Sequence, residues 1–489
     1  MLKLFGIILL ISSTLFSVCH AETNKTFLLS LDESILLAVR KNPNVKITQL
    51  NQVLQKFALE VQEWEFHPHY LLQASHQTTR TYSVTTHGMV TSNVSGIVPS
   101  ASLLTPLGTR MTLSAPNNIT GNYNPGLTFE VIQPLMRGFG KPIVEAELYN
   151  AIDSEKISRL NTEGELRNTV TAVINAYLDV ILAKNTLEID QKAFDREKIS
   201  YVQTQKFIKA GHKAKVELVT VQAGIAHLRT RIETDKNLLE QARYELLTTI
   251  GIDPDTPVVF SSIDVKKLIN KYHIPTLMDS KQRILENDIQ YQIAQITIEG
   301  AEKRAILIAK DNTRWQLDVR LNGSVGNSTG GGKHAGINSL VNGVNMTNSS
   351  TVNLTIPIDD REAKNQLASA KIALQQAEIA LQQQKWIIQK NAINGWRNVF
   401  SAERVMEYSR TAEQLQQQNY LINSKKYAFG LIDSLELQTA QIELVSTQKD
   451  LADNQIDYLK ALVNLDNLTG MTLKTWNIQV QNYPSETFL

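Results

Sequence analysis

Two short stretches of the chain repeat one arrangement of a glycine and an acid. Gly211 precedes Glu217 in FIKAGHKAKVELVTVQ (207–222), and Gly430 precedes Glu436 in KYAFGLIDSLELQTAQ (426–441), at a constant offset of 219 residues. Glycine reaches left-handed backbone angles without a steric penalty, so each stretch predicts a tight turn before a helix. A carboxylate in the first turn of a helix is favoured by the helix dipole, and several such carboxylates together attract cations.

Other residues give little support for catalysis. The chain has no G-x-S-x-G motif, no H-E-x-x-H motif and no close His/Cys/Asp cluster, and its nine histidines are scattered. His67 and His69 lie together, but we interpret them as a junction between a helix and a strand rather than a metal site. GNSTGGGKH (326–334) resembles a phosphate loop, but Asn327 and His334 replace residues that such a loop needs, so we predict no bound cofactor.

Long helices must position the repeated acids. Residues 143–253 and 358–483 contain no proline, which costs about 3 kcal/mol inside a helix, and both runs are rich in Ala, Leu, Gln, Glu, Lys and Arg. Residues 177–251 match 396–470 without a gap. Each run therefore predicts an ascending helix, a glycine turn and a descending helix. The first ascending arm would span roughly 100 Å at about 1.5 Å per residue, so the arms must pack against one another lengthwise.

The repeat continues upstream, where residues 34–70 align with 280–315 and Asn42 meets Asn287. This alignment defines the predicted organisation of the chain. The first repeat covers 22–251, with helices in 32–66, strands within 67–135 and a hairpin at 143–251. The second covers 279–470, with helices in 279–311, strands within 314–358 and a hairpin at 360–470. Residues 252–278 and 471–489 break the helical pattern and form connecting segments.

Between the helices, apolar and polar residues alternate. WQLDVRLN (315–322) is the clearest case, and 352–356, 127–133 and 70–83 follow it less strictly. Alternation predicts strands with one apolar and one wet face, whereas 84–124 and 326–350 look like exposed loops. A small soluble β-domain is the ordinary explanation. The strand lengths and the long helices favour a membrane wall instead, with Trp64, Tyr70, Tyr123, Phe129 and Trp315 as candidate interfacial aromatics.

The N-terminus predicts export. A positive start, an apolar stretch and a small-x-small site ending at Ala21 are typical of a secretory signal peptide, which we place at 1–21. Lipidation of Cys19 and an uncleaved anchor remain alternatives. Cys19 is the only cysteine, so the mature chain would form no disulfide.

Strand count then predicts oligomerisation. About four strands per chain cannot close a barrel, and an open edge cannot face lipid. Two copies would give eight strands and a filled interior, whereas three give twelve strands and a water-filled lumen. We therefore predict a trimer.

At this point the chain resembles the TolC family of outer-membrane efflux proteins. The resemblance rests on SLDESILLAVRKNPNVK (30–46), QPLMRGFG (133–140) and the turns AGHKAKVEL (210–218) and FGLIDSLEL (429–437). It covers essentially the whole mature chain as a duplicated module. It implies an α+β membrane protein: a homotrimer whose four strands per chain form a transmembrane β-barrel, and whose long α-helical hairpins form a periplasmic barrel. A belt surrounds the helices at mid-height, for which 252–278 and 471–489 are the candidate segments.

The resemblance also assigns the tips of the hairpins. It implies that Gly211, Gly430 and Leu431 lie at the periplasmic tips that contact an adaptor, and that acids there line a closed entrance. Glu436, Asp433, Thr439 and Glu217 are the aperture candidates. Thr439 stands where some members have a second Asp, so a doubled acidic ring is in doubt. A solvated glutamate at a helix start remains the alternative for Glu217 and Glu436.

These observations predict a passive exit duct and no enzyme. The resemblance implies a periplasmic adaptor (membrane fusion protein), an inner-membrane transporter and outer-membrane lipid as partners, in efflux or type I secretion, in the outer membrane of a Gram-negative bacterium. The net charge of +1 gives no sign of nucleic-acid binding. A structural or adhesive coiled-coil protein and a periplasmic adaptor are the alternative functions.

Overall fold

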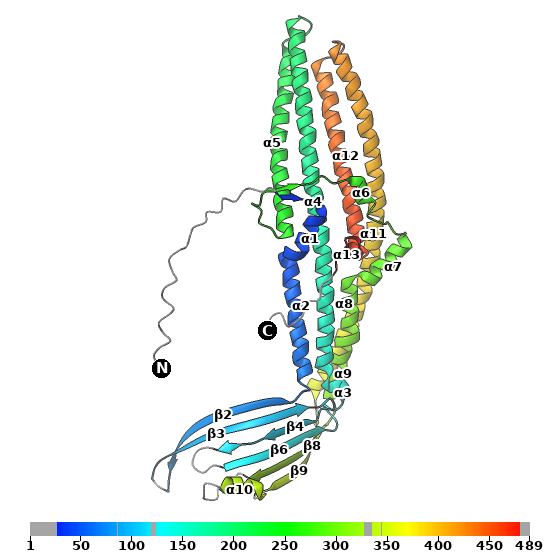
Figure 1. Cartoon of the computed structure of the whole chain (residues 1–489). Coiled ribbons are helices and arrows are strands. Elements are labelled where there is room, and N and C mark those ends of the chain that lie inside the picture. The colour runs from blue at the N-terminus through cyan, green and yellow to red at the C-terminus, as the bar shows by residue number, and fades with distance from the viewer. Residues whose placement is uncertain (1–26, 86, 119–123, 327–334, 344, 480–489) are drawn as a thin grey trace, which may run out of the picture.

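The computed structural model describes residues 27–85, 87–118, 124–326, 335–343 and 345–479. The predicted signal peptide with Cys19, the end of the 471–489 segment, and Tyr123 lie outside these ranges. Two long helical hairpins reach one end of the molecule, and one curved sheet forms the other end (Figure 1). In the described part, no helix is both apolar enough and long enough to span a bilayer.

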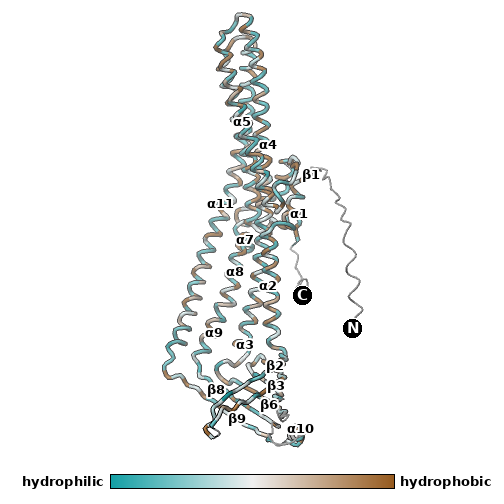
Figure 2. Tube along the Cα trace, turned by 90° about the vertical axis from the view of Figure 1, so that its left-hand side faces the viewer, coloured by the Kyte–Doolittle hydropathy of each residue, from teal (hydrophilic) through white to brown (hydrophobic). Residues whose placement is uncertain are grey.

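The two hairpins have the same plan. The first consists of α4 (Ala146–Lys209) and α5 (Val216–Ile250), and the second of α11 (Arg361–Ala428) and α12 (Ser434–Leu468). The 64 residues of α4 and the 68 residues of α11 each reach roughly 100 Å at about 1.5 Å per residue. The tube trace shows polar and apolar residues mixed along these arms, and α11 diverges from the other labelled helices toward the sheet (Figure 2).

A shorter helical segment precedes the sheet-forming part of each repeat. In the first repeat it comprises α1 (Leu31–Lys41) and α2 (Pro43–Trp64). In the second it comprises α7 (Leu277–Asn287), α8 (Ile289–Thr297), the π-helical turn η1 (Ile298–Glu302) and α9 (Lys303–Asn312). The remaining short helices are α3 (Lys141–Val144), α6 (Val265–Ile269), α10 (Ala335–Val341) and α13 (Thr472–Thr475).

Asn42 and Asn287 play equivalent roles at the breaks in these segments. The amide of Asn42 donates to the carbonyl of Thr249 at 2.7 Å, and that of Asn287 donates to Thr469 at 3.0 Å. Each asparagine thereby supplies a donor to an otherwise unpaired carbonyl at the end of a descending helix. The weaker upstream part of the sequence repeat therefore corresponds to a repeated contact in space.

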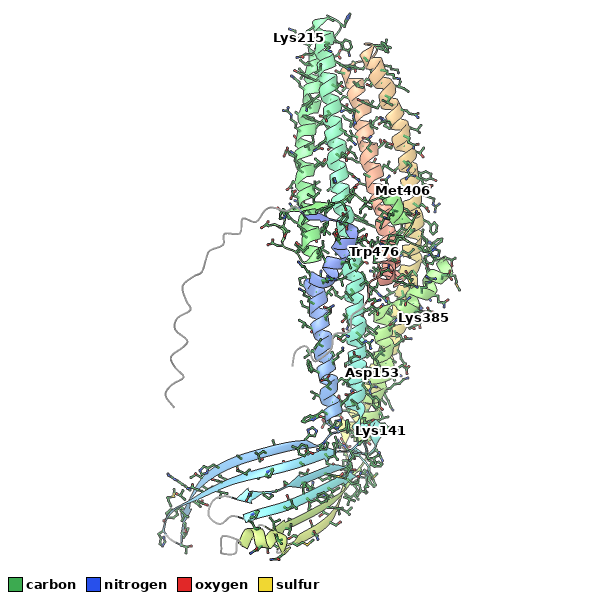
Figure 3. All side chains as sticks on the ribbon, viewed as in Figure 1. Lys141, Asp153, Lys215, Lys385, Met406 and Trp476 are labelled. Carbon is green, nitrogen blue, oxygen red and sulfur yellow. The ribbon has the colours of Figure 1, made fainter. Side chains whose placement is uncertain are left out.

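The main apolar core lies at mid-height. It is centred on α4, whose Tyr177 is fully buried, and it also takes in residues of α1, α5, α12 and the flanking segments. The Tyr177 hydroxyl lies 3.0 Å from the carbonyl of Leu29 and 2.8 Å from that of Ser261. These carbonyls belong to, or follow, the parallel strands β1 (Phe27–Leu29) and β7 (Val258–Phe260). Trp476, just after α13, packs into the same level (Figure 3).

The sheet is larger than the sequence predicted. Its order is β2 (His69–Ser83), β3 (Gly88–Leu104), β4 (Arg110–Ser114), β6 (Asn124–Pro134), β8 (Gln316–Gly326) and β9 (Thr347–Thr355). The short β5 (Asn117–Asn118) continues the line of β4, because it also pairs with β3 and β6. Neighbours along this order are antiparallel.

Two predictions for this region were wrong. Residues 84–124 are not simply a loop, because β3, β4 and β5 lie within them and pair with β2 and β6. The chain therefore has six strand positions across the sheet rather than four. In 326–350, α10 and the start of β9 replace part of the predicted loop.

Gly251 and Gly430 follow the ends of two helices with similar backbone angles but different surroundings. Both have positive φ, +84° and +73°, but a Cβ at Gly251 would lie 2.7 Å from the carbonyl oxygen of Lys41, whereas nothing lies within 4 Å at Gly430. We expect Gly430→Ala to cost about 1 kcal/mol from backbone strain alone. Gly251→Ala must also displace the backbone, so its cost should exceed 2 kcal/mol by the scale of overpacking.

Thermal unfolding of the two variants measures this difference. Equal shifts of the unfolding midpoint would contradict the close contact between Gly251 and the end of α1.

Candidate gate at the helical tips

The two tips are built by the same backbone motif. Gly211 and Gly430 adopt left-handed φ values of +76° and +73°. The amide of His212 donates to the carbonyl of Phe207, and that of Leu431 donates to Lys426, both at 2.9 Å. These bonds close each ascending helix in the way typical of a glycine C-cap. The repeated glycine is thus needed for the chain reversal in both hairpins.

An ion pair within the first tip bonds to the backbone of the second. Lys213 Nζ lies 2.9 Å from Glu217 Oε2 and donates to the carbonyl of Ile432, also at 2.9 Å. The side chain of Lys213 is only 5% exposed, and that of Glu217 is 19% exposed. Glu217 in turn accepts a bond from the amide of Ser434, the first residue of α12, at 3.2 Å. We call Lys213, Glu217, Ile432 and Ser434 the tip latch.

Tyr427 supports the tip latch from below. It is fully buried, and its ring centroid lies 4.0 Å from Lys213 Nζ. Its hydroxyl lies 2.5 Å from Thr204 Oγ1 on α4, and its ring meets that of Phe207 edge-on at 5.9 Å. An aromatic face attracts a cation, so Tyr427 adds to the interactions that hold Lys213 between the hairpins.

The acids of the second tip are placed differently from Glu217. Asp433 is the N-cap of α12, and its carboxylate accepts a bond from the amide of Glu436 at 2.8 Å. Glu436 and Thr439 are exposed on the first turns of α12, and Leu431 is 73% exposed in the turn itself. Glu436 and Thr439 are thus on the surface of this single chain, whereas Glu217 is held between its two hairpins.

Below the tips, a charged cluster links the hairpins again. Asp190 of α4 is fully buried and lies 2.7 Å from Arg231 of α5 and 2.9 Å from Lys449 of α12. Lys449 also lies 3.5 Å from Asp235. Removing one partner of a buried pair leaves an uncompensated charge, so this cluster fixes how α12 sits against α4 and α5.

Between the charged cluster and the tips lies a cavity of about 330 Å³ that contains a buried acid. Glu197 of α4 is 3% exposed there, and burial raises its pKa to about 7. Gly224 of α5 makes this possible, because a Cβ there would lie 2.8 Å from Glu197 Oε1. The charged and polar groups that face the carboxyl are His227 and Arg231 from α5, Gln438 and Gln441 from α12, and Tyr420 from α11.

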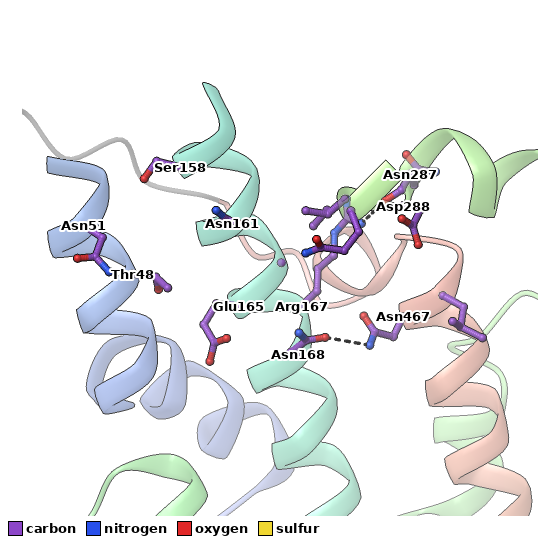
Figure 4. Close-up of a pocket in the computed structure, with 14 residues that line it drawn as sticks. Thr48, Asn51, Ser158, Asn161, Glu165, Arg167, Asn168, Asn287, Asp288 and Asn467 are labelled. Carbon is purple, nitrogen blue, oxygen red and sulfur yellow. Dashed lines mark hydrogen bonds between the residues drawn. The ribbon is translucent and has the colours of Figure 1, made fainter. Parts of the chain in front are cut away.

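A second, more polar pocket of about 510 Å³ lies below the mid-height core, where α2, α4, α8 and the end of α12 meet (Figure 4). Arg167 donates to the carbonyl of Asn287 at 2.9 Å, and Asn467 lies 3.4 Å from Asn168. Its side chains are mainly amides and hydroxyls that hold helix ends, without a nucleophile beside a base. Among the described residues, no three side chains are grouped to bind a metal ion.

This chain is similar to known proteins in sequence and in fold. Residues 282–471 match the family model of outer membrane efflux proteins. The predicted resemblance to that family is confirmed. The same match supports the predicted location in the outer membrane. The family consists of transport channels. No curated protein matches the chain in sequence.

Solved outer membrane channels share the fold of the whole chain. CusC is similar with a TM-score of 0.68 at 17% identity, covering 91% of this chain and 93% of that one. The CmeC channel of Campylobacter jejuni gives 0.66 at 13% identity, covering 94% and 88%. The open state of the MtrE channel of Neisseria gonorrhoeae gives 0.66 at 16% identity, covering 90% and 88%.

Sequence reasoning found the tips but missed several residues that connect them. Lys213 lies in the first turn, whereas Glu197 and Asp190 lie on α4, and all three face residues of the second hairpin that no local spacing predicts. The only available signal was that these charged residues stand among apolar ones in a helix expected to pack on several sides.

Lys213→Met tests the tip latch. The change leaves the carboxylate of Glu217 without its cation and Ile432 without a donor, which should weaken the contact between the tips by about 2 kcal/mol. We expect faster amide hydrogen exchange at the start of α12, measured by mass spectrometry on peptides that contain Ser434.

Lys209→Met is the matched control, because Lys209 is an exposed lysine near the same turn. Exchange that rises equally in both variants, or in neither, would contradict the tip latch.

Glu197→Gln tests the buried acid. Below pH 4.5 the carboxyl is protonated in both the folded and the unfolded chain, so it does not affect stability. As the pH rises towards about 7, only the unfolded chain loses the proton, so stability falls, and the loss is complete above pH 7. The variant should therefore be more stable than the parent by about 3 kcal/mol at pH 8, with little gain at pH 4.5.

Thermal midpoints across this range give the measurement. Glu378→Gln, at an exposed position on α11, should show no such dependence on pH. A gain for Glu197→Gln that is the same at both pH values would contradict burial as the cause.

Proposed function

We propose that this protein is the outer-membrane exit duct of a tripartite efflux pump or of a type I secretion system. It acts as a passive trimeric channel that is gated at its periplasmic helix tips. The duct provides a wet path and a gated entrance, and the energy comes from its partner transporter.

One observation carries the proposal: a sheet with an apolar face lies at one end of the molecule, and two matched hairpin tips lie roughly 100 Å of helix away at the other end. A soluble β-domain has no need for such arms. A duct needs both ends, one in the outer membrane and one deep in the periplasm. The family match and the shared fold support the same reading.

We propose that the tips contact a periplasmic adaptor, which connects the duct to an inner-membrane transporter. Gly211, Gly430 and Leu431 lie in the two turns, where a partner can reach them. Phe429 is 80% exposed beside Leu431, so the second tip presents two apolar side chains to the surroundings. Exposed apolar side chains grouped in this way are typical of a protein contact.

For the gate we propose two roles. Glu436, with Asp433 and Thr439 nearby, lines the aperture when three copies assemble, because its carboxylate is exposed at the tip. Glu217 acts within one chain, since Lys213 and Ser434 hold its side chain. Opening then requires the two hairpins of a chain to move apart at the tip latch.

A structural or adhesive coiled-coil protein is the alternative. It would not need a sheet with one apolar and one polar face, and it would have no reason to conduct ions.

Planar-bilayer recording tests the duct. The mature protein, extracted in detergent as a trimer, should form cation-preferring channels. Glu436→Gln should lower the preference for cations, because it removes a ring of negative charge at the entrance. Glu378→Gln serves as the control, because it removes the same charge from an exposed position on α11 outside the proposed aperture.

A mature chain that is a water-soluble monomer, with no channel activity, would contradict the duct. Trimeric channels whose selectivity is unaffected by Glu436→Gln would remove Glu436 from the aperture and leave the duct standing.

A further inference from the structure

The two sides of the sheet differ along all six strand positions. Paired residues point to the same side, so the register defines an apolar face and a polar face. In the half of the sheet nearest the helical body, the apolar face comprises Tyr70, Leu72, Ala74, Ile97, Pro99, Ala101, Met111, Leu113, Leu127, Phe129, Val131, Leu317, Val319, Leu321, Val352 and Leu354. Gln133, Asn348 and Ser350 are polar exceptions on this face, and further out on β2 and β3 the same face carries polar residues such as His76, Thr78 and Ser95. The polar face includes Gln73, Ser75, Ser100, Ser102, Thr112, Ser114, Thr128, Glu130, Asp318, Arg320, Asn322, Thr351 and Asn353; Leu71, Val98 and Ile132 are apolar exceptions on it.

The strands that the sequence did not predict share this division. On β4, Met111 and Leu113 continue the apolar face between Ala101 of β3 and Phe129 of β6. Ser114 Oγ lies 2.5 Å from Thr128 Oγ1 on the polar face, where Arg320 also pairs with Glu130 at 3.6 Å. A hairpin lying outside the wall would have no reason to keep this alternation, so β3 and β4 are part of the wall.

The outer two strands of the sheet are unpaired on one side. β2 and β9 end the order of strands, and both are exposed along almost their whole length. Tyr70 and Leu72 on β2 are 81% and 70% exposed, and Val352 on β9 is 64% exposed. Peptide groups in hydrocarbon must be paired, so these edges require partners.

The even number of strand positions indicates what can pair with the edges at β2 and β9. β2 runs away from the helical body, since it follows α2, and β9 runs back to it, since it leads into α11. With six positions, the first and last strands are antiparallel, so β2 of one copy can extend the antiparallel order of β9 in the next. The apolar face then continues from Val352 and Leu354 to Tyr70 and Leu72. A second copy of this chain therefore fits each edge.

We propose that each chain contributes six strands to the membrane wall, that β2 of one copy pairs with β9 of the next, and that three copies close a barrel of eighteen strands. This inference rests on the proposed function. At equal tilt, the circumference scales with the number of strands, so the outer-membrane pore would be about 1.5-fold wider than with four strands per chain. Barrels of this strand number leave an aqueous channel.

Cysteine labelling tests whether β4 is in the wall. The mature chain has no cysteine if it begins after Ala21, so single cysteines can be placed at Met111, Thr112, Leu113 and Ser114. In proteoliposomes, a charged maleimide should label positions 112 and 114 through the lumen. It should label 111 and 113 at least about tenfold more slowly, because hydrocarbon excludes charge. Val319→Cys and Arg320→Cys on β8 give the reference rates for the two faces.

Crosslinking tests the edges. Gln73→Cys on β2 is combined in turn with Ser349→Cys, Thr351→Cys or Asn353→Cys on the polar face of β9. At least one pair should form disulfides between copies. The largest crosslinked species on denaturing gels should then be a trimer. Gln73→Cys with Val352→Cys is the control, because these side chains point to opposite faces.

The outcomes separate the strand count from the function. Trimeric channels in which positions 111 to 114 react at equal rates would overturn the six-strand wall and leave the duct in place. Crosslinked dimers as the largest species, or trimers without any crosslink from β2 to β9, would overturn the eighteen-strand closure. A monomer without channel activity would overturn the duct as well.

Discussion

Unpaired peptide groups at the ends of the sheet are the constraint on which the rest of the molecule depends. Near the helical body each strand pairs with a neighbour on both sides, except on the outer sides of β2 and β9. Water can satisfy such groups in a soluble protein, but hydrocarbon cannot. A chain that places this sheet in a membrane is therefore incomplete alone, and its helices must also assemble as several copies. The duplicated hairpins suit this requirement, because in the proposed trimer each copy would supply two similar arms to a common tube.

The arms bury little apolar surface by themselves, and their packing depends on polar contacts between hairpins. Apart from the mid-height core, buried apolar residues form small separate clusters along the arms. Between these clusters lie the pair of Lys449 and Asp190, the cavity of Glu197 and the tip latch. Removing one partner of such a contact leaves a buried polar group or charge without compensation. Above the mid-height core, the seam between α12 and the first hairpin therefore depends largely on these polar contacts.

The sequence predicted the long helices and glycine turns well, because both follow from local rules. Proline-free runs and left-handed glycines need no tertiary contact to be recognised. The strand β3 was missed since its residues are mostly Ser, Thr, Asn and small apolar types, and Gly96 and Pro99 interrupt its alternation. Only pairing with β2 and β4 reveals that it is a strand. Glu217 was assigned to the aperture from its place after Gly211. Its contact with Ser434 joins residues 217 positions apart, and no spacing rule predicts such a contact.

The mid-height core holds the base of the helical arms that lead to the tips. Tyr177 anchors α4 at that level, and Gly211 lies 34 residues further along the chain, or about 50 Å away at 1.5 Å per helical residue. Over this distance, a rotation of only five degrees displaces the end by about 4 Å, which exceeds the length of a hydrogen bond. If α4 turned about Tyr177, a small change of packing there would therefore give a large displacement at the tip without bending the helix.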